Sequence, residues 1–316
     1  MHRLSYILGA FLIAALYSLP TATQAWDLSY YLDFATRAVI FAIAAVSLDL
    51  ILGYGGMVSF GHAAFLGIGG YAVGILGYHG ITDGFTHFAV AIGASALVAL
   101  FIGMVSVRTT GVYFIMITLA FSQMLYYLAI SLNAYGGDDG LSLRGASDFS
   151  GLIDLSDHDH LYYVSLTLLL LCLLFCYRLI GARFGMVLKG IKSDERRLIA
   201  IGFSPFRFKL LAFVLSGVMC GISGALLANQ TLFISPAIMH WSRSGEVMVM
   251  VILGGMSTLF GPVIGAALYL GLEETLSRFT SHWQLLLGPL LVVVVLFARN
   301  GIFGLFTRRR RKIGHG

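Results

Sequence analysis

The stretch LYYVSLTLLLLCLLFCYRLI at residues 161–180 carries one charged side chain, Arg178, near its end. Such a run is long enough to cross the hydrocarbon core of a membrane as a helix, which takes about 20 apolar residues. Similar runs of about 15 to 20 residues recur along the chain. Hydrophobic residues make up 58% of the 316 positions and charged residues only 11%, against about a quarter in soluble domains. The runs do not alternate polar and apolar residues as barrel strands do, so helices must satisfy the backbone in lipid.

Ten membrane segments are expected, and the predicted fold is all-α: a polytopic transmembrane helical bundle of about eight to ten membrane segments with glycine-broken helices. The segments cover roughly residues 4–20, 37–54, 58–78, 87–107, 111–131, 161–180, 209–229, 245–259, 262–277 and 283–298. Three regions are expected: an N-terminal helix and periplasmic linker over 1–36, a transmembrane domain over 37–299, and a basic cytoplasmic tail over 300–316. The first segment also resembles a cleavable signal peptide, so retention and cleavage both stay open.

Positive charge orients this bundle, because Lys and Arg are enriched in cytoplasmic loops. Of the 20 Lys and Arg residues, eight lie in 178–209 and six in 299–312, so both regions are predicted to be cytoplasmic. Arg3 and Arg108 also fall on the inner side. Four arginines are then left on the outer side: Arg37, Arg144, Arg243 and Arg278. The loop 132–160, with six Asp and one Arg, also falls outside.

Whether the number of spans before the C-terminus is even or odd decides whether the Arg-rich tail lies inside the cell, and this parity constrains residues 245–277. If they formed one long span, the Arg-rich tail would lie outside the cell. The segment is therefore predicted to be a hairpin that turns near Leu253 to Pro262, in the stretch LGGMSTLFGP.

Asp49 is the only carboxylate deep within a predicted span. A lone ion in that position costs about 3 kcal/mol, so the side chain should face the protein interior and have a partner. Two interpretations stay open: Asp49 lines the solute path, or it makes a hydrogen bond between helices.

The glycine-rich stretch that follows, GYGGMVSFGHAAFLGIGGY at 53–71, should not form a continuous helix, because each interior glycine costs about 1 kcal/mol. Backbone freed by such a break must face protein or a watered cavity, and transporters build substrate sites at broken helices. Ser59 and His62 lie in this break. A second glycine-rich stretch, GGMSTLFG at 254–261, echoes the GGMVSFG at 55–61, either as a repeat or by chance.

Other polar residues give weaker signals. His62 is interpreted either as a proton relay or as a histidine bonded to a backbone carbonyl, and Gln123 either as part of the solute path or as a contact between helices. The DHDH at 157–160 and the three cysteines lack a completed ligand set, so neither a metal site nor a cofactor is predicted, and the cysteines are expected to be buried hydrophobes.

The charged segment at 178–209 interrupts the apolar runs and has helical character. Ser193 is predicted to cap a short helix with Asp194 and Glu195 in its first turn, followed by Leu198, Ile199 and Ile201, and ended by Gly202. The chain has no G-x-x-x-x-G-K-[ST] phosphate loop, so it cannot hydrolyse ATP by that route. This amphipathic helix is predicted to dock another protein; a basic surface for anionic lipid is the alternative.

The sequence also resembles a known family, the permease subunits of binding-protein-dependent ABC importers for branched-chain amino acids. The resemblance covers nearly the whole chain from about residue 37. It is carried by LDLILGYGGMVSFGHAAFLGIGGY (48–71), TTGVYFIMITLAFSQ (109–123), GGDDGL (136–141), RFGMVLKGIKSDERRLIAIGFSPFRFKLLAFVLSG (183–217) and ILGGMSTLFGPVIGAAL (252–268). In such families a cytoplasmic coupling helix inserts into a cleft on an ATPase subunit. The resemblance implies this role for Gly190, Lys192, Asp194, Glu195 and Gly202. The family usually has Asn where Asp49 stands, which puts the substrate or the protonation state of that site in doubt.

The resemblance implies a multi-pass permease of the bacterial inner membrane with both termini cytoplasmic if the first helix is retained. Its implied partners are a second homologous permease, two cytoplasmic ATPases, a periplasmic solute-binding protein and membrane lipid, but no nucleic acid. The chain is expected to be a transport subunit and not an enzyme. Two alternatives stay open: a permease for urea or short amides, and a stand-alone secondary transporter or channel coupled through Asp49 or His62.

Overall fold

The computed structural model describes residues 29–149, 151 and 153–279, together with Tyr17, Pro20, His282, Leu285 and 287–289. The longer helices are α3 (Ser29–Asp49), α4 (His62–Tyr78), α5 (Gly84–Ser106), α6 (Val112–Ser131), α7 (His158–Gly181), α8 (Arg183–Ser193), α10 (Pro205–Thr231), α11 (Trp241–Gly254) and α12 (Gly261–Phe279). The shorter helices are η1 (Leu50–Tyr54), η2 (Asn133–Tyr135), η3 (Gly137–Asp139), α9 (Glu195–Ala200) and η4 (Pro236–Met239). The strands β1 (Leu141–Ser142) and β2 (Phe233–Ile234) pair antiparallel. The all-α prediction is confirmed.

Five helices in the described residues are long and apolar enough to cross a membrane: Tyr30–Tyr54, Gly84–Ser106, Val112–Ser131, His158–Gly181 and Pro205–Thr231. The chain is therefore a multi-pass membrane protein. Helix α3 begins at Ser29, earlier than the predicted 37, so part of the expected linker is helical. The predicted segments 4–20 and 283–298 and the tail 300–316 lie wholly or largely outside the described residues.

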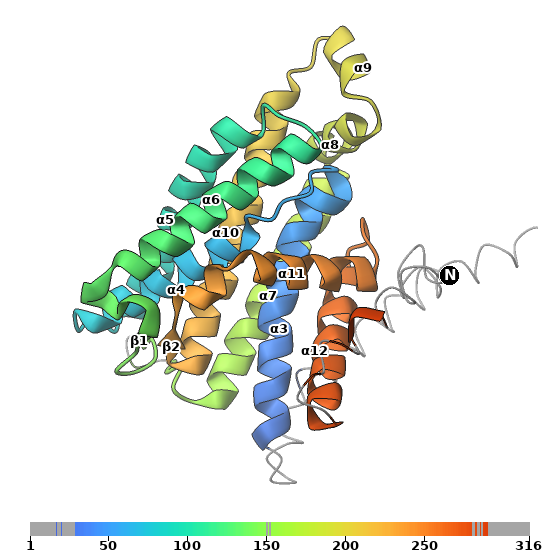
Figure 1. Ribbon diagram of the computed structural model, residues 1–316. Coiled ribbons are helices and arrows are strands. Elements are labelled where there is room, and N and C mark those ends of the chain that lie inside the picture. Colours follow the sequence, from blue (N-terminus) through green and yellow to red (C-terminus); the bar gives the residue numbers. More distant parts are fainter. Residues whose placement is uncertain are drawn as a thin grey trace, which may run out of the picture.

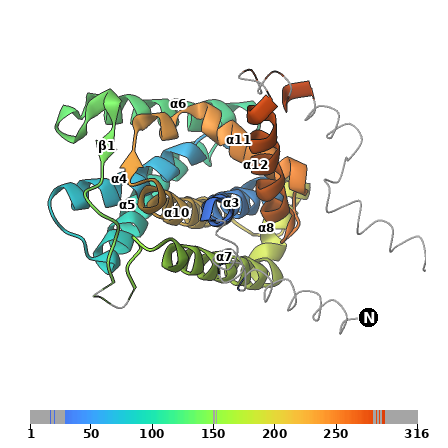
Figure 2. The same cartoon turned by 90° about the horizontal axis from the view of Figure 1, so that it is seen from below.

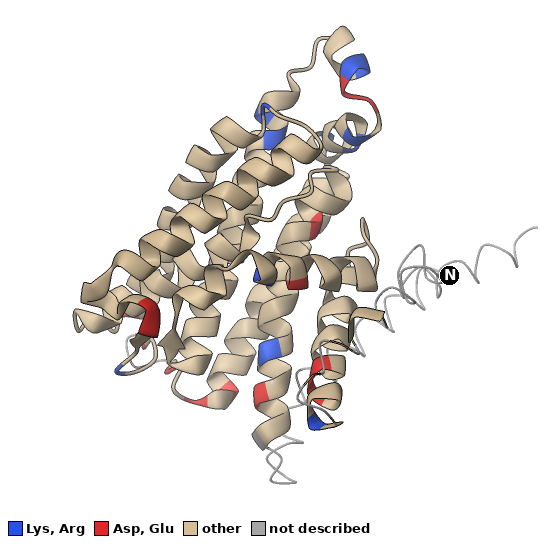
Figure 3. Ribbon diagram, viewed as in Figure 1, with Lys and Arg blue, Asp and Glu red and all other residues tan. Residues whose placement is uncertain are grey.

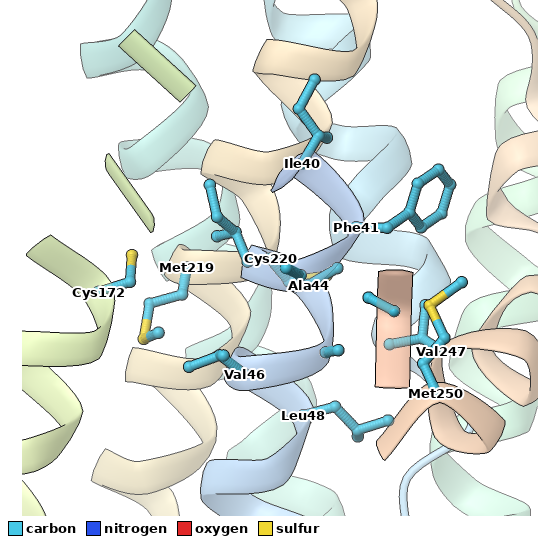
Figure 4. Packing of buried hydrophobic residues seen from close by; sticks show 14 of the residues in the cluster. Ile40, Phe41, Ala44, Val46, Leu48, Cys172, Met219, Cys220, Val247 and Met250 are labelled. Atoms are coloured by element: carbon cyan, nitrogen blue, oxygen red, sulfur yellow. The ribbon is translucent and has the colours of Figure 1, made fainter. Parts of the chain in front are cut away.

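Helices α3 and α10 form the centre of the bundle, with the other helices around them (Figures 1 and 2). The apolar window of the first span is 83% buried and that of α10 is 67% buried, whereas that of α6 is only 22% buried. The two central helices therefore contact protein, and α6 leaves most of its surface for lipid. Figure 4 shows side chains of α3 packed between α10, which provides Met219 and Cys220, and α11, which provides Val247 and Met250. All three cysteines are free and buried, as predicted.

Close helix packing at glycines holds this centre together. A Cβ at Gly69 would overlap the carbonyl of Gly221, and a Cβ at Gly224 would overlap the carbonyl of Leu66, so α4 and α10 meet backbone to backbone. Other glycines of the same two helices also lie at contacts between elements. Gly217 and Gly221 face Ala99 and Ser95 of α5, and Gly70 and Gly74 pack against Ile234 of β2.

The predicted helix break is confirmed between α3 and α4. Helix α3 widens into the π-helix η1, and residues 55–61, here called the first glycine turn, are not helical. Gly56 in this turn has φ +70°, a conformation that favours glycine. The chain therefore has an irregular backbone between two apolar helices.

The predicted hairpin over 245–277 is also confirmed. Helices α11 and α12 are joined by residues 255–260, here called the second glycine turn, and Gly254 and Gly265 bring the two helices into close contact. The prediction that 245–259 is a membrane span is wrong. Helix α11 has only 14 residues and lies across the bundle (Figures 1 and 2). The hairpin is therefore not the pair of spans that the charge argument counted, because one of its two limbs does not span.

Candidate functional site

The second glycine turn meets the end of α3 at Asp49, the last residue of that helix. Its side chain is 2% exposed, and Oδ1 accepts a hydrogen bond of 2.9 Å from the backbone N–H of Ser257 in the second glycine turn. The Ser257 hydroxyl in turn donates to the carbonyl of Gly53 at 2.6 Å. Ser257 has φ +60°, so this turn is held in a conformation that few non-glycine residues adopt. The cavity beside Asp49 has a volume of about 10 Å³, which is room for a water molecule and not for an organic solute.

Lys192 of α8 reaches the same junction from outside the bundle. Its Nζ donates to the carbonyl of Gly53 at 2.5 Å and to the hydroxyl of Ser257 at 3.3 Å. Its aliphatic stem lies against Gly56, where any Cβ would collide with it. The neighbouring Lys189 places its ammonium 5.6 Å from the ring centroid of Tyr54, a cation–π contact. Helix α8 of the charged segment is thus hydrogen-bonded to η1 and to the second glycine turn, and the stem of its Lys192 contacts Gly56 of the first glycine turn.

His62 begins α4 in a separate buried polar cluster. Its Nε2 lies 2.7 Å from Ser216 Oγ and its Nδ1 lies 3.3 Å from Ser59 Oγ. The Ser216 hydroxyl donates its only proton to the carbonyl of Ser47, so it accepts from Nε2–H. Both ring nitrogens lie within hydrogen-bond distance of a serine hydroxyl, which is the arrangement of a histidine that fixes neighbouring helices.

Side chains from α6 and α11 satisfy the irregular backbone of the first glycine turn. Thr118 Oγ1 accepts from the N–H of Phe60 at 3.3 Å. Ser244 Oγ accepts from the N–H of Ala63 at 2.9 Å and donates to the carbonyl of Phe60 at 2.7 Å. The break is thus held by hydrogen bonds to protein, as the absence of water in a membrane interior requires.

The structure brings Ser59 and His62 together, but it does not join them to Gln123. Gln123 is half-buried on α6, and its side chain forms no hydrogen bond within the described part of the chain. Asp49 bonds the second glycine turn and not the His62 cluster. The predicted path residues therefore occupy separate places in the bundle.

The charged segment folds into two helices at one end of the molecule, with α9 farthest from the bundle (Figure 1). Figure 3 shows Lys and Arg gathered at this end and most Asp and Glu at the other. The predicted cap at Ser193 is wrong. Ser193 ends α8, and Asp194 caps α9 by accepting from the N–H groups of Arg196 and Arg197. The predicted end is right, because Gly202 with φ +89° follows the helix.

Helices α8 and α9 present different surfaces. Val187, Leu188 and Ile191 of α8 are buried against the bundle, whereas α9 has no buried residue. Ile199 is 57% exposed and Ile201 is 69% exposed, so two large apolar side chains point away from the bundle on its charged end. The segment is thus anchored through α8 and leaves α9 free to contact another protein.

Glu195 is not free at this surface. Its Oε2 lies 2.6 Å from Nζ of Lys209, whose side chain is only 6% exposed. Glu195 therefore fixes α9 against the start of α10. Its partner was counted in the sequence only as an orienting charge, and no spacing signal would have paired the two.

These features define a class of protein. A lipid-facing helical bundle with a broken central helix, bonded to a charged two-helix segment at one end, is typical of the membrane part of a transporter. The family described as branched-chain amino acid transport system / permease component matches residues 30–296. The chain belongs to this family and is a non-catalytic permease component of such an ABC transport system.

Individual relatives agree with this assignment. The chain is 29% identical to the high-affinity branched-chain amino acid transport system permease protein LivM of Escherichia coli K12, over 90% of this chain and 72% of the relative. The LivM protein of Salmonella typhimurium LT2 matches with the same figures. A probable branched-chain amino acid transport permease protein LivM of Methanocaldococcus jannaschii is 24% identical over 79% of this chain and 82% of the relative. No solved structure matches the chain significantly.

Proposed function

We propose that this chain imports branched-chain amino acids across the bacterial inner membrane as one subunit of an ATP-driven importer. The complete importer contains a second homologous permease, two cytoplasmic ATP-binding subunits and a periplasmic solute-binding protein. The chain itself contributes half of the pathway and the surface on which one ATPase docks. The family membership and the arrangement of α8 and α9 support this proposal.

The observation that carries the proposal is the bonding of Lys192. Lys192 lies on a helix at the charged end of the molecule and donates to the carbonyl of Gly53, at the end of a broken membrane helix. The same ammonium also reaches Ser257, which holds Asp49. A displacement of α8 therefore acts at once on η1 and on the second glycine turn.

The mechanism follows from this connection. ATP closes the two ATPase subunits, and α9, docked in one of them, moves with it. Because Glu195 and Lys209 join α9 to α10, the motion also reaches the central helix whose Ser216 bonds His62. The glycine turns are the points where the backbone can change direction, so the pathway opens alternately to the two sides of the membrane.

The bonding of the polar residues disfavours a stand-alone ion-coupled transporter. Both nitrogens of His62 are occupied, and Asp49 accepts a backbone hydrogen bond beside a cavity no larger than a water molecule. A proton or sodium relay needs an exposed face on such groups, which neither side chain has.

Reconstitution into liposomes tests the proposal. The four-subunit complex with its solute-binding protein should accumulate radiolabelled leucine only with ATP on the ATPase side, and urea and acetamide should not compete. The matched control is this chain alone, which should accumulate nothing under a proton or sodium gradient. Leucine accumulation by the chain alone, or uptake of urea in place of leucine, would falsify the assignment.

A further inference from the structure

A second cavity, of about 180 Å³, lies between α3, α4, α10 and α11, apart from the Asp49 junction. Two guanidinium groups line it, those of Arg37 and Arg243. Its volume is comparable to that of engineered cavities of about 150 Å³ that bind benzene, so a small organic solute fits.

Both arginines lie within helices of the bundle and not in an outer loop. Arg37 is eight residues into α3, about 12 Å from its first residue at the helical rise of 1.5 Å per residue. Arg243 is on α11, which lies across the bundle (Figure 1). Ionised side chains inside a membrane protein are costly and mark substrate pathways by default.

Each arginine is balanced but not saturated. Arg37 lies 3.5 Å from Glu273, and Arg243 lies 2.7 Å from Glu246. Each guanidinium has five N–H donors, so one carboxylate contact leaves donors for a ligand. The four charges sum to zero, which favours a ligand without net charge over a free anion or cation.

The rest of the lining sorts by chemistry. The hydroxyl of Thr231 has the carbonyls of Leu227 and Phe233 within hydrogen-bond distance, at 2.9 and 2.7 Å, so its proton is engaged and it offers lone pairs to the cavity. Lone pairs are what an ammonium group requires. The walls are apolar and include Phe41, Leu66 and Leu227. The cavity thus combines N–H donors for a carboxylate, an oxygen acceptor for an ammonium group and an apolar surface.

We infer that this cavity is a binding site for an aliphatic α-amino acid, with the carboxylate on Arg37 and Arg243, the ammonium at Thr231 and the side chain against Phe41 and Leu66. The inference rests on the proposed function for the identity of the cargo and adds where in the chain it binds. Urea and short amides have no carboxylate to use the two guanidinium groups, so the site discriminates against them.

A cysteine reporter in the cavity tests the inference. Ser235 lines it, and the three native cysteines are buried, so Ser235→Cys should be the principal site of reaction with N-ethylmaleimide. In membranes containing the full importer, saturating leucine should slow this reaction, and urea should leave its rate unchanged. Phe233→Cys is a second reporter from the same lining.

Arginine variants then test the contact. In the reporter background, Arg243→Gln should raise the leucine concentration for half-maximal protection about 10- to 100-fold, the loss expected for charge-assisted hydrogen bonds. Arg37→Gln tests the second guanidinium independently. The matched control is Arg278→Gln, an exposed arginine of α12 that also pairs with a glutamate, and it should leave protection unchanged.

The outcomes separate this inference from the proposed function. If membranes accumulate leucine with ATP but leucine protects neither cysteine reporter from N-ethylmaleimide, the proposed site is wrong. It is also wrong if leucine protects the reporter fully in both Arg37→Gln and Arg243→Gln. Membranes of the unmodified importer that do not accumulate leucine at all overturn the proposed function instead.

Discussion

The double variant Ile199→Ala, Ile201→Ala should weaken ATPase docking without weakening the fold. Both side chains are exposed in the isolated chain, at 57% and 69%, so their truncation removes no core contact. Each substitution deletes about three methyl or methylene carbons, each worth about 0.8 kcal/mol on burial. Scaled by the exposed fractions, the loss is about 1.4 and about 1.7 kcal/mol, or about 3 kcal/mol together. The dissociation constant should rise roughly 100-fold.

Binding of purified ATPase subunit to the permease pair in nanodiscs measures this directly. The control is Ile81→Ala, a partly exposed isoleucine between α4 and α5, away from α8 and α9. Thermal unfolding of both variants should match that of the unmodified chain, since surface substitutions change stability by no more than about 0.5 kcal/mol. Unchanged ATPase affinity in the double variant would refute docking at α9, and equal weakening by Ile81→Ala would refute its specificity.

Three further predictions concern the bonded junctions. Asp49→Asn keeps an acceptor for the N–H of Ser257 and should retain uptake. Asp49→Leu leaves that amide unpaired and should lower the free energy of unfolding by about 1–3 kcal/mol. Equal thermal stability of the two variants would contradict the hydrogen bond. Lys192→Met keeps the aliphatic stem but loses the ammonium contacts. Leucine uptake should therefore fall about 10-fold, the effect of losing one charged hydrogen bond, while ATP hydrolysis continues. A parallel fall in both rates would indicate a docking defect instead. Glu195→Gln leaves the nearly buried ammonium of Lys209 without its counter-charge and should lower the yield of the complex with the ATPase. Adding Lys209→Met should restore that yield. No recovery in the double variant would mean that loss of the ion pair does not cause the low yield.

The fold was predictable wherever a single strong signal acted. Apolar runs long enough for a bilayer identified the five long apolar helices, and the glycine content of 53–71 located the helix break. Charge parity required the hairpin over 245–277, which the structure contains. It could not distinguish a span from a helix that lies across the bundle, because α11 is apolar through burial against protein and not through contact with lipid.

The candidate sites were less predictable, because their contacts join residues that are distant in the sequence. His62 and Ser216 are 154 positions apart, and Asp49 and Ser257 are 208 apart. Ser257 lies in the glycine-rich stretch 254–261, which is similar in sequence to residues 55–61. This similarity was the only sequence signal that linked Ser257 to the region after Asp49. Arg37 and Arg243 were counted as outer-side charges, because the positive-inside rule counts charges and does not tell which of them face a cavity.

Cross-linking at α9 tests the central claim, that an ATPase drives this permease through the segment containing α8 and α9. Ile201→Cys introduces an exposed thiol in a chain whose native cysteines are buried. Treatment of membranes containing the whole importer with a benzophenone maleimide, which reacts with the thiol and then inserts into a neighbouring C–H bond under ultraviolet light, should yield an adduct of this chain with the ATPase subunit. Ile81→Cys should yield none. An ATPase adduct at Ile81 together with none at Ile201 would contradict the account.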